Sequence, residues 1–225
     1  MASGILLEWR DIPQRMATEQ APKGTVTLGT FATISRHIFT DALADMMREH
    51  PDVKCRVKLG LADSLLRELE SGAIDVVYLI GDIDIRGLDV VELREVPMRV
   101  VLSTELWPHD TPPPLAFLST LPLAIWSGPT EPSFQMVERH AGSLGLLSSR
   151  SHEIPHIETL TALASTGTCY TILPDYVVDQ ARYGLEVWPL EGFDKTFPLK
   201  RYTAKNKHHS MATREVMERI DASIA

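Results

Sequence analysis

The sequence is poor in the features that anchor or cross-link a protein. It has no apolar run near the roughly 20 residues needed to span a membrane, so we expect no contact with a membrane. Its two cysteines, Cys55 and Cys169, make no disulfide framework, and no export signal precedes them. These absences predict a cytoplasmic protein with reduced thiols.

Signatures of catalysis are missing as well. There is no Gly-rich phosphate loop and no Gly-x-Ser-x-Gly elbow. His152 and His156 suggest a metal site only weakly, because Pro155 prevents the helical spacing that such a pair needs. The formal net charge of −8 disfavours binding of nucleic acid by this chain. We therefore expect no metal, no cofactor and no enzymatic activity.

The stretch Gly24–Gly81 has the pattern strand–helix–strand–helix–strand. Its expected elements are a strand at 25–29, a helical pattern to about 48, a strand after 51, a helix to about 70 and a strand at 74–80. This order predicts an α/β fold with a parallel sheet. The strand at 53–59 has one polar face and is expected at an edge, whereas 74–80 is apolar throughout and is expected to be covered on both faces. Asp75 is expected to be a structural hydrogen-bonding group.

The rest of the chain repeats this α/β pattern. Strands are expected at 88–93, 96–102, 121–126, 170–173, 185–190 and 198–204, and helices at 134–147, 156–165, 175–183 and 214–220. Residues 107–114 are rich in proline and are expected to be irregular. The pattern is typical of two Rossmann-like lobes, joined by crossover strands near 96–102 and 198–202.

Ligands of such sheets bind beyond the carboxyl ends of the strands. Three turns there carry small or hydroxylic residues, and Trp126 offers a surface for stacking. The candidate ligand-binding residues are Thr30, Phe31, Ala32, Thr33, Gly60, Leu61, Ala62, Ile80, Gly81, Trp126, Ser127, Gly128 and Thr168. Thr33 or Ser35 is the expected cap of the first helix.

Several motifs in order resemble the effector-binding domain of LysR-type transcriptional regulators. They are Gly-x-Val-x-Leu-Gly from Gly24, His50-Pro51-Asp52-Val53, the Gly60 turn, Leu69-x-x-Gly72-x-Ile74-Asp75, 121–126, 157–174 and Gly184-Leu185. The resemblance covers about four fifths of the chain and implies the two-lobed fold of type 2 periplasmic binding proteins.

The resemblance implies a sensor that binds a small-molecule effector between its lobes and forms a homodimer or tetramer through lobe surfaces. Residues 1–23 would be vector-derived residues and the end of a linker helix, 24–97 with 200–225 lobe I, and 98–199 lobe II. A winged helix-turn-helix domain, absent from this chain, would contact DNA, and ligand-dependent rearrangement of the dimer would transmit the signal.

Three departures from the family pattern concern the pocket. Phe31 stands where serine is frequent, Ala62 where a small polar residue is usual, and Cys169 where a second glycine is common. They predict an apolar or aromatic ligand with one anionic group near Thr30 and Thr33. Two alternatives remain at this point: a solute-binding protein of a transport system, and an enzyme on the same scaffold.

Overall fold

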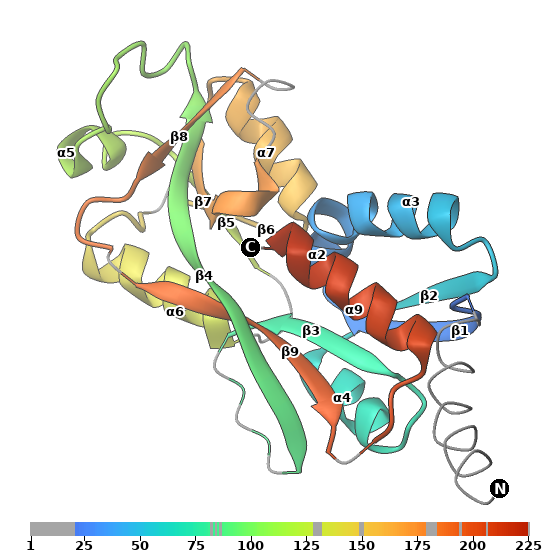
Figure 1. Cartoon of the computed structure of the whole chain (residues 1–225). Helices are drawn as coiled ribbons and strands as arrows, with labels where there is room; N and C mark the ends of the chain where they lie inside the picture. The colour runs from blue at the N-terminus through green and yellow to red at the C-terminus, as the bar shows by residue number, and fades with distance from the viewer. Residues whose placement is uncertain are drawn as a thin grey trace, which may run out of the picture.

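A computed structural model describes residues 21–81, 83, 85, 87–127, 132–148, 151–178, 184–193, 195–205 and 207–224, with the backbone alone at 132–136. It has two α/β lobes, as expected from the sequence (Figure 1). The expected linker helix and Gly128 lie outside these residues. No helix in the described ranges is both long and apolar enough to cross a membrane.

Lobe I contains the first three strands and the last one. Its elements are β1 (Gly24–Thr30), α2 (Ala32–His37), α3 (Phe39–Glu49), β2 (Val53–Leu59), α4 (Ala62–Glu70), β3 (Val76–Ile80), the first part of β4 (Leu88–Ser103), β9 (Thr196–Ala204) and α9 (Met211–Ile224). Strands β1, β2 and β3 are parallel, and β9 is antiparallel to β3.

Lobe II contains the middle of the chain. Its elements are the second part of β4, α5 (Leu115–Leu118), β5 (Leu123–Trp126), α6 (Pro132–Ser143), β6 (His152–Ile154), α7 (Ile157–Ser165), β7 (Tyr170–Pro174), the 3-10 turn η1 (Asp175–Val177) and β8 (Leu185–Pro189). Strand β5 is parallel to both β6 and β7. The path of paired strands is β2-β1-β3-β9-β4-β7-β5-β6, and β8 pairs with β4.

Strand β4 belongs to both lobes. Residues 88–97 pair with β9, and residues 98–103 pair with β7 and β8 (Figure 1). The sequence predicted two strands broken at Arg94-Glu95, and this prediction was wrong. The strand continues through the charged pair because a register shift between Glu92 and Arg94 accommodates it, and because Arg94 pairs with Asp175 of η1.

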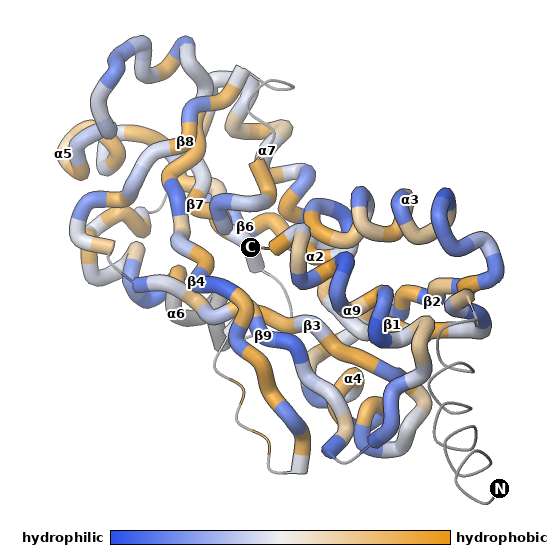
Figure 2. Tube along the Cα trace, in the orientation of Figure 1, coloured by the Kyte–Doolittle hydropathy of each residue, from blue (hydrophilic) through white to orange (hydrophobic). Residues whose placement is uncertain are grey.

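Each sheet is covered by helices on both faces. Residues Val76 and Tyr78 of β3 pack in the cluster that contains α3 and α9, whereas Val77 and Leu79 pack against α4. In lobe II, Val100 of β4 shares a cluster with α6, and Val101 shares another with α7. Strand β3 is accordingly coloured mainly as hydrophobic in Figure 2, whereas β4 and β9 alternate between hydrophobic and hydrophilic residues.

Strand β2 is at the edge of the sheet and β3 is fully buried, which confirms both predictions. Two local features differ from the sequence reading. The first predicted helix is divided at Ile38, where Thr40 donates its hydroxyl to the carbonyl of Arg36 and competes with the helical bonding. No strand was expected at 152–154, but these residues form β6, which pairs with β5 at the end of the path.

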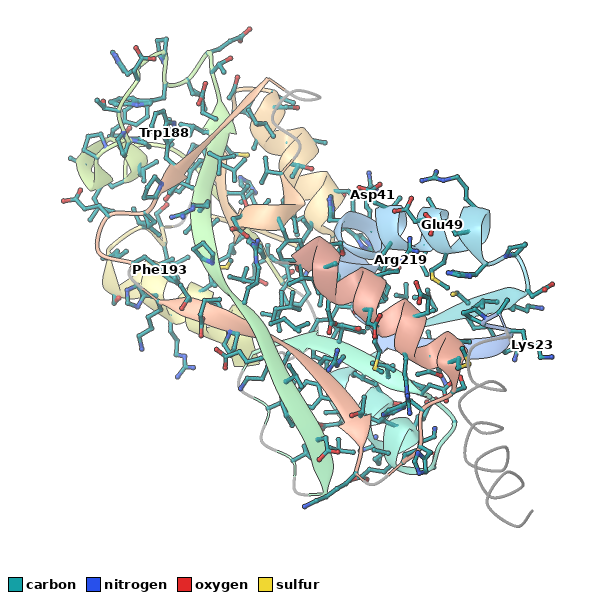
Figure 3. The ribbon with its side chains drawn as sticks, in the orientation of Figure 1. Lys23, Asp41, Glu49, Trp188, Phe193 and Arg219 are labelled. Carbon is teal, nitrogen blue, oxygen red and sulfur yellow. The ribbon has the colours of Figure 1, made fainter. Side chains whose placement is uncertain are left out.

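Helix α9 is fixed to lobe I by polar contacts. Arg219 pairs with Glu49 of α3 and with Glu215 of its own helix (Figure 3). The buried hydroxyl of Tyr78 donates to Asp221 at 3.0 Å. These contacts attach the C-terminal helix to β3 and α3.

Asp75 holds β1 beside β3, as the sequence suggested for a structural group. Its backbone amide donates to the Thr27 carbonyl at 2.9 Å, and its Oδ2 accepts from the Thr27 amide at 3.0 Å. Lys207 donates to Oδ1 at 3.1 Å. One carboxylate thus satisfies a strand amide and a lysine from the other end of the chain.

We expect Asp75→Ala to lower the free energy of unfolding by about 1–3 kcal/mol, because the Thr27 amide and Lys207 lose their partner. Urea unfolding followed by circular dichroism would measure this. Asp89→Ala, at an exposed position of β4, is the control and should change stability by less than about 0.5 kcal/mol. Equal effects of the two substitutions would contradict the role of Asp75.

Candidate functional site

A cavity of about 240 Å³ lies between the lobes. Lobe I contributes the residues after β1 and at the end of β2, and lobe II contributes the end of β5 and the start of α7. The lining residues are Phe31, Ala32, Thr33, Leu59, Gly60, Leu61, Trp126, Pro155, His156, Ile157 and Glu158. The cavity is therefore at the carboxyl ends of the parallel strands of both lobes.

Three helices begin at this cavity without a side-chain cap. The N-cap residues of α2, α4 and α7 are Phe31, Leu61 and His156, and none makes a side-chain capping hydrogen bond. The prediction that Thr33 or Ser35 caps the first helix was wrong, because Phe31 occupies the cap. The first amides of a helix have no partner within it, so these starts present N–H groups near the cavity.

Most of the cavity wall is apolar. Phe31 and Trp126 line it from opposite lobes, together with leucine, isoleucine and proline side chains. The indole N–H of Trp126 donates to the Pro155 carbonyl at 3.1 Å, which fixes the ring against the α7 side of the cavity. Leu59 and Leu61 are 54% and 51% exposed, so they line the cavity where solvent reaches it.

Two polar contacts join the lobes beside the cavity. The hydroxyls of Thr33 and Tyr176 are 3.1 Å apart, and the His37 ring meets Tyr176 edge-on. Arg36 of α2 is 3.5 Å from Glu158 of α7, with both side chains nearly half exposed. These contacts link α2 of lobe I to η1 and α7 of lobe II.

A second, much smaller cavity of about 20 Å³ adjoins the first through shared residues. It is lined by Phe31, Thr33, Ile80, Val96, Met98, Val137, Pro174, Tyr176 and Phe197. Phe31 and Thr33 line both cavities. The side chain of Phe31 thus helps to determine how far the larger cavity extends toward the crossing strand β4.

The structure brings together six of the sequence-predicted site residues: Phe31, Ala32, Thr33, Gly60, Leu61 and Trp126. Ile80 lines the smaller cavity. Ala62, Gly81 and Ser127 line neither. Thr30 is fully buried and donates its hydroxyl to the Tyr78 carbonyl at 2.8 Å, away from the cavity. Thr168 lines another hollow, in lobe II, with Cys169 and His152.

The sequence reading missed residues 155–158 and Tyr176. A signal was present for the first group, because a helix was expected to start at residue 156 and helix starts supply site residues in such folds. Tyr176 had no comparable signal, since its position follows from how η1 turns back toward α2.

The described residues include no group of three or more His, Cys, Asp or Glu side chains that could hold a metal ion. Cys55 is in lobe I and Cys169 in lobe II, and both are free. Burial raises the pKa of both thiols, which keeps them protonated and weakly reactive.

The chain is similar to known transcriptional regulators. HTH-type transcriptional regulator CzcR of Bacillus anthracis is 22% identical over 174 residues, which are 77% of this chain and 57% of that protein. The chain thus spans a little more than half the length of such relatives.

Two solved structures share the fold. HinK, a LysR family transcriptional regulator from Pseudomonas aeruginosa, superimposes with a TM-score of 0.76 at 16% identity, covering 97% of this chain and 76% of that one. The effector binding domain of QuiR in complex with shikimate gives a TM-score of 0.67 at 14% identity, covering 90% and 98%. The family model "LysR substrate binding domain" matches residues 19–224. Because that match extends over nearly the whole chain, the chain belongs to the LysR substrate binding domain family.

Proposed function

We propose that this chain is the ligand-sensing, effector-binding domain of a LysR-type transcriptional regulator, and that its small-molecule inducer binds in the cavity between the lobes. The observation that carries the proposal is that a single cavity of about 240 Å³ receives residues from both lobes. A molecule there contacts both lobes at once. QuiR, with the same fold, holds shikimate in its effector binding domain.

Ligand binding is coupled to lobe position through the contacts that border the cavity. Thr33 and Glu158 line the cavity and also join the lobes, through Tyr176 and Arg36. A ligand that replaces or strengthens these contacts binds one lobe arrangement better than the other. That differential affinity is the energy available for a switch.

The remaining steps belong to the whole regulator. We propose that two copies associate through lobe surfaces and that closure of the lobes changes how the dimer presents its DNA-binding domains. DNA contact is assigned to a winged helix-turn-helix outside this sequence, in keeping with the net charge of −8 on this chain. Cytoplasmic action in transcription regulation follows from this role.

We propose binding without turnover. Among the described residues that line the cavity, the only ionisable side chains are His156 and Glu158, and Glu158 is paired with Arg36. The Thr33 hydroxyl is bonded to Tyr176 rather than to a base. This set lacks the adjoining nucleophile and general base that an enzyme of acyl or phosphoryl transfer needs.

The first test is a thermal-shift screen of small metabolites on this 225-residue protein, because a ligand that binds the folded state raises its melting temperature. For a compound found in this way, Thr33→Ala should weaken binding about five- to tenfold, since one hydrogen bond near the ligand is lost. Ser35→Ala, on the same helix but outside both cavities, is the matched control. An unchanged dissociation constant for Thr33→Ala would remove Thr33 from the site.

The contact between Arg36 and Glu158 predicts a second effect. Arg36→Met should raise the population of open lobes by up to about fivefold, because an exposed ion pair contributes at most about 1 kcal/mol. Small-angle X-ray scattering would detect it as a larger radius of gyration. Arg48→Met is the control, since Arg48 pairs with Asp45 within α3 and joins no lobes. A scattering profile that is identical for Arg36→Met and the unaltered protein would exclude a latch at this position.

A further inference from the structure

We infer that the effector of the inter-lobe cavity is an uncharged aromatic molecule of one or two rings, and not a carboxylate or a phosphate. This inference rests on the proposed function, because it names the chemical class of the ligand for the same cavity. Three properties of the lining carry it: its size, its aromatic pair and its charge balance.

The size of the cavity sets the size of the ligand. A dry apolar cavity of about 150 Å³ accommodates benzene, and the present cavity has about 240 Å³. One substituted ring or two fused rings therefore fit. Phe31 and Trp126 supply ring surfaces from opposite lobes, and stacking of a third ring adds to simple apolar burial. A planar aromatic molecule uses both surfaces better than a flexible chain does.

The charged side chains around the cavity disfavour an anion. None of the described lining residues is a lysine or an arginine. Arg36 pairs with the lining residue Glu158, and its guanidinium is already 3.5 Å from that carboxylate. A bound carboxylate would lose its hydration next to the Glu158 carboxylate, and no lysine or arginine of the described lining would compensate its charge. Such dehydration is unfavourable.

The same surroundings disfavour a cation. An ammonium group would have to displace Arg36 from Glu158. Helices α4 and α7, of nine residues each, also begin at the cavity, and the N-terminal end of a helix carries a partial positive charge. Acidic residues in the first turns of these helices, Asp63 in α4 and Glu158 in α7, already offset that partial charge, so the first amides suit a neutral oxygen acceptor, such as that of an amide, ketone or phenol. An uncharged ring bearing such an oxygen satisfies every part of the lining.

The test compares three probes by isothermal titration calorimetry on the 225-residue protein at neutral pH: 2-naphthamide, 2-naphthoate and cyclohexanecarboxamide. The first two share a ring system and differ in charge, and the third lacks aromatic rings. We expect 2-naphthamide to bind at least about tenfold more tightly than either of the others. Tighter binding of 2-naphthoate or cyclohexanecarboxamide, or saturable binding of none of the three, overturns the inference.

Substitutions in the cavity wall test whether 2-naphthamide binds there. Trp126→Leu should weaken 2-naphthamide about tenfold, because one stacking surface is lost. Trp107→Leu, outside both cavities, is the control. If Trp126→Leu does not fold, Phe31→Leu makes the same test from lobe I. Equal affinity of these cavity variants and the control would overturn the inference.

Glu158→Gln tests the charge argument separately. Removing the carboxylate releases Arg36, so the preference for 2-naphthamide over 2-naphthoate should fall about fivefold. An unchanged preference would overturn the charge argument.

Failure of the proposed function gives a different result. In that case no compound of the metabolite screen binds with an affinity that changes when residues of the cavity are substituted. Failure of the inference alone leaves a screen ligand that is charged or non-aromatic and still depends on Trp126.

Discussion

The pairing of β4 with two sets of strands is the constraint on which the rest of the structure depends. Its first part pairs with β9 and its second part with β7 and β8, so one strand fixes the two sheets relative to each other. Val96, Met98 and Val100, around the change of partners, are buried and share one apolar cluster with residues of both lobes. The lobes are thus joined through a packed core, and motion between them bends a strand.

The helices that begin at the cavity are less stable than helices with a side-chain cap. The cavity is formed where strands end and helices begin, and these helix starts have lost their usual side-chain caps to Phe31, Leu61 and His156. Each missing cap costs about 1 kcal/mol by comparison with serine or aspartate. The residues that replace the caps, two of them apolar, line the cavity. At all three positions the N-cap residue lines the cavity and does not cap its helix.

Much of the fold was accessible from the sequence because its strongest signals are local. The alternation in 53–59 and the apolar run before Ile80 identified an edge strand and a buried one. The continuity of β4 through Arg94 was not accessible, since it depends on Asp175, 81 residues later. In the site, strand ends identified Phe31, Thr33 and Trp126. Tyr176 was missed because only the tertiary arrangement brings η1 to α2.

Phe31 borders both the larger cavity and the small cavity that adjoins it. The side chain at position 31 therefore contributes to the shape and polarity of both cavities. A serine at this position has a smaller and more polar side chain, so it would enlarge the space between the two cavities and make their shared wall more hydrophilic. Sensors of this architecture can in this way acquire new specificities during evolution by exchanging one side chain on an unchanged scaffold.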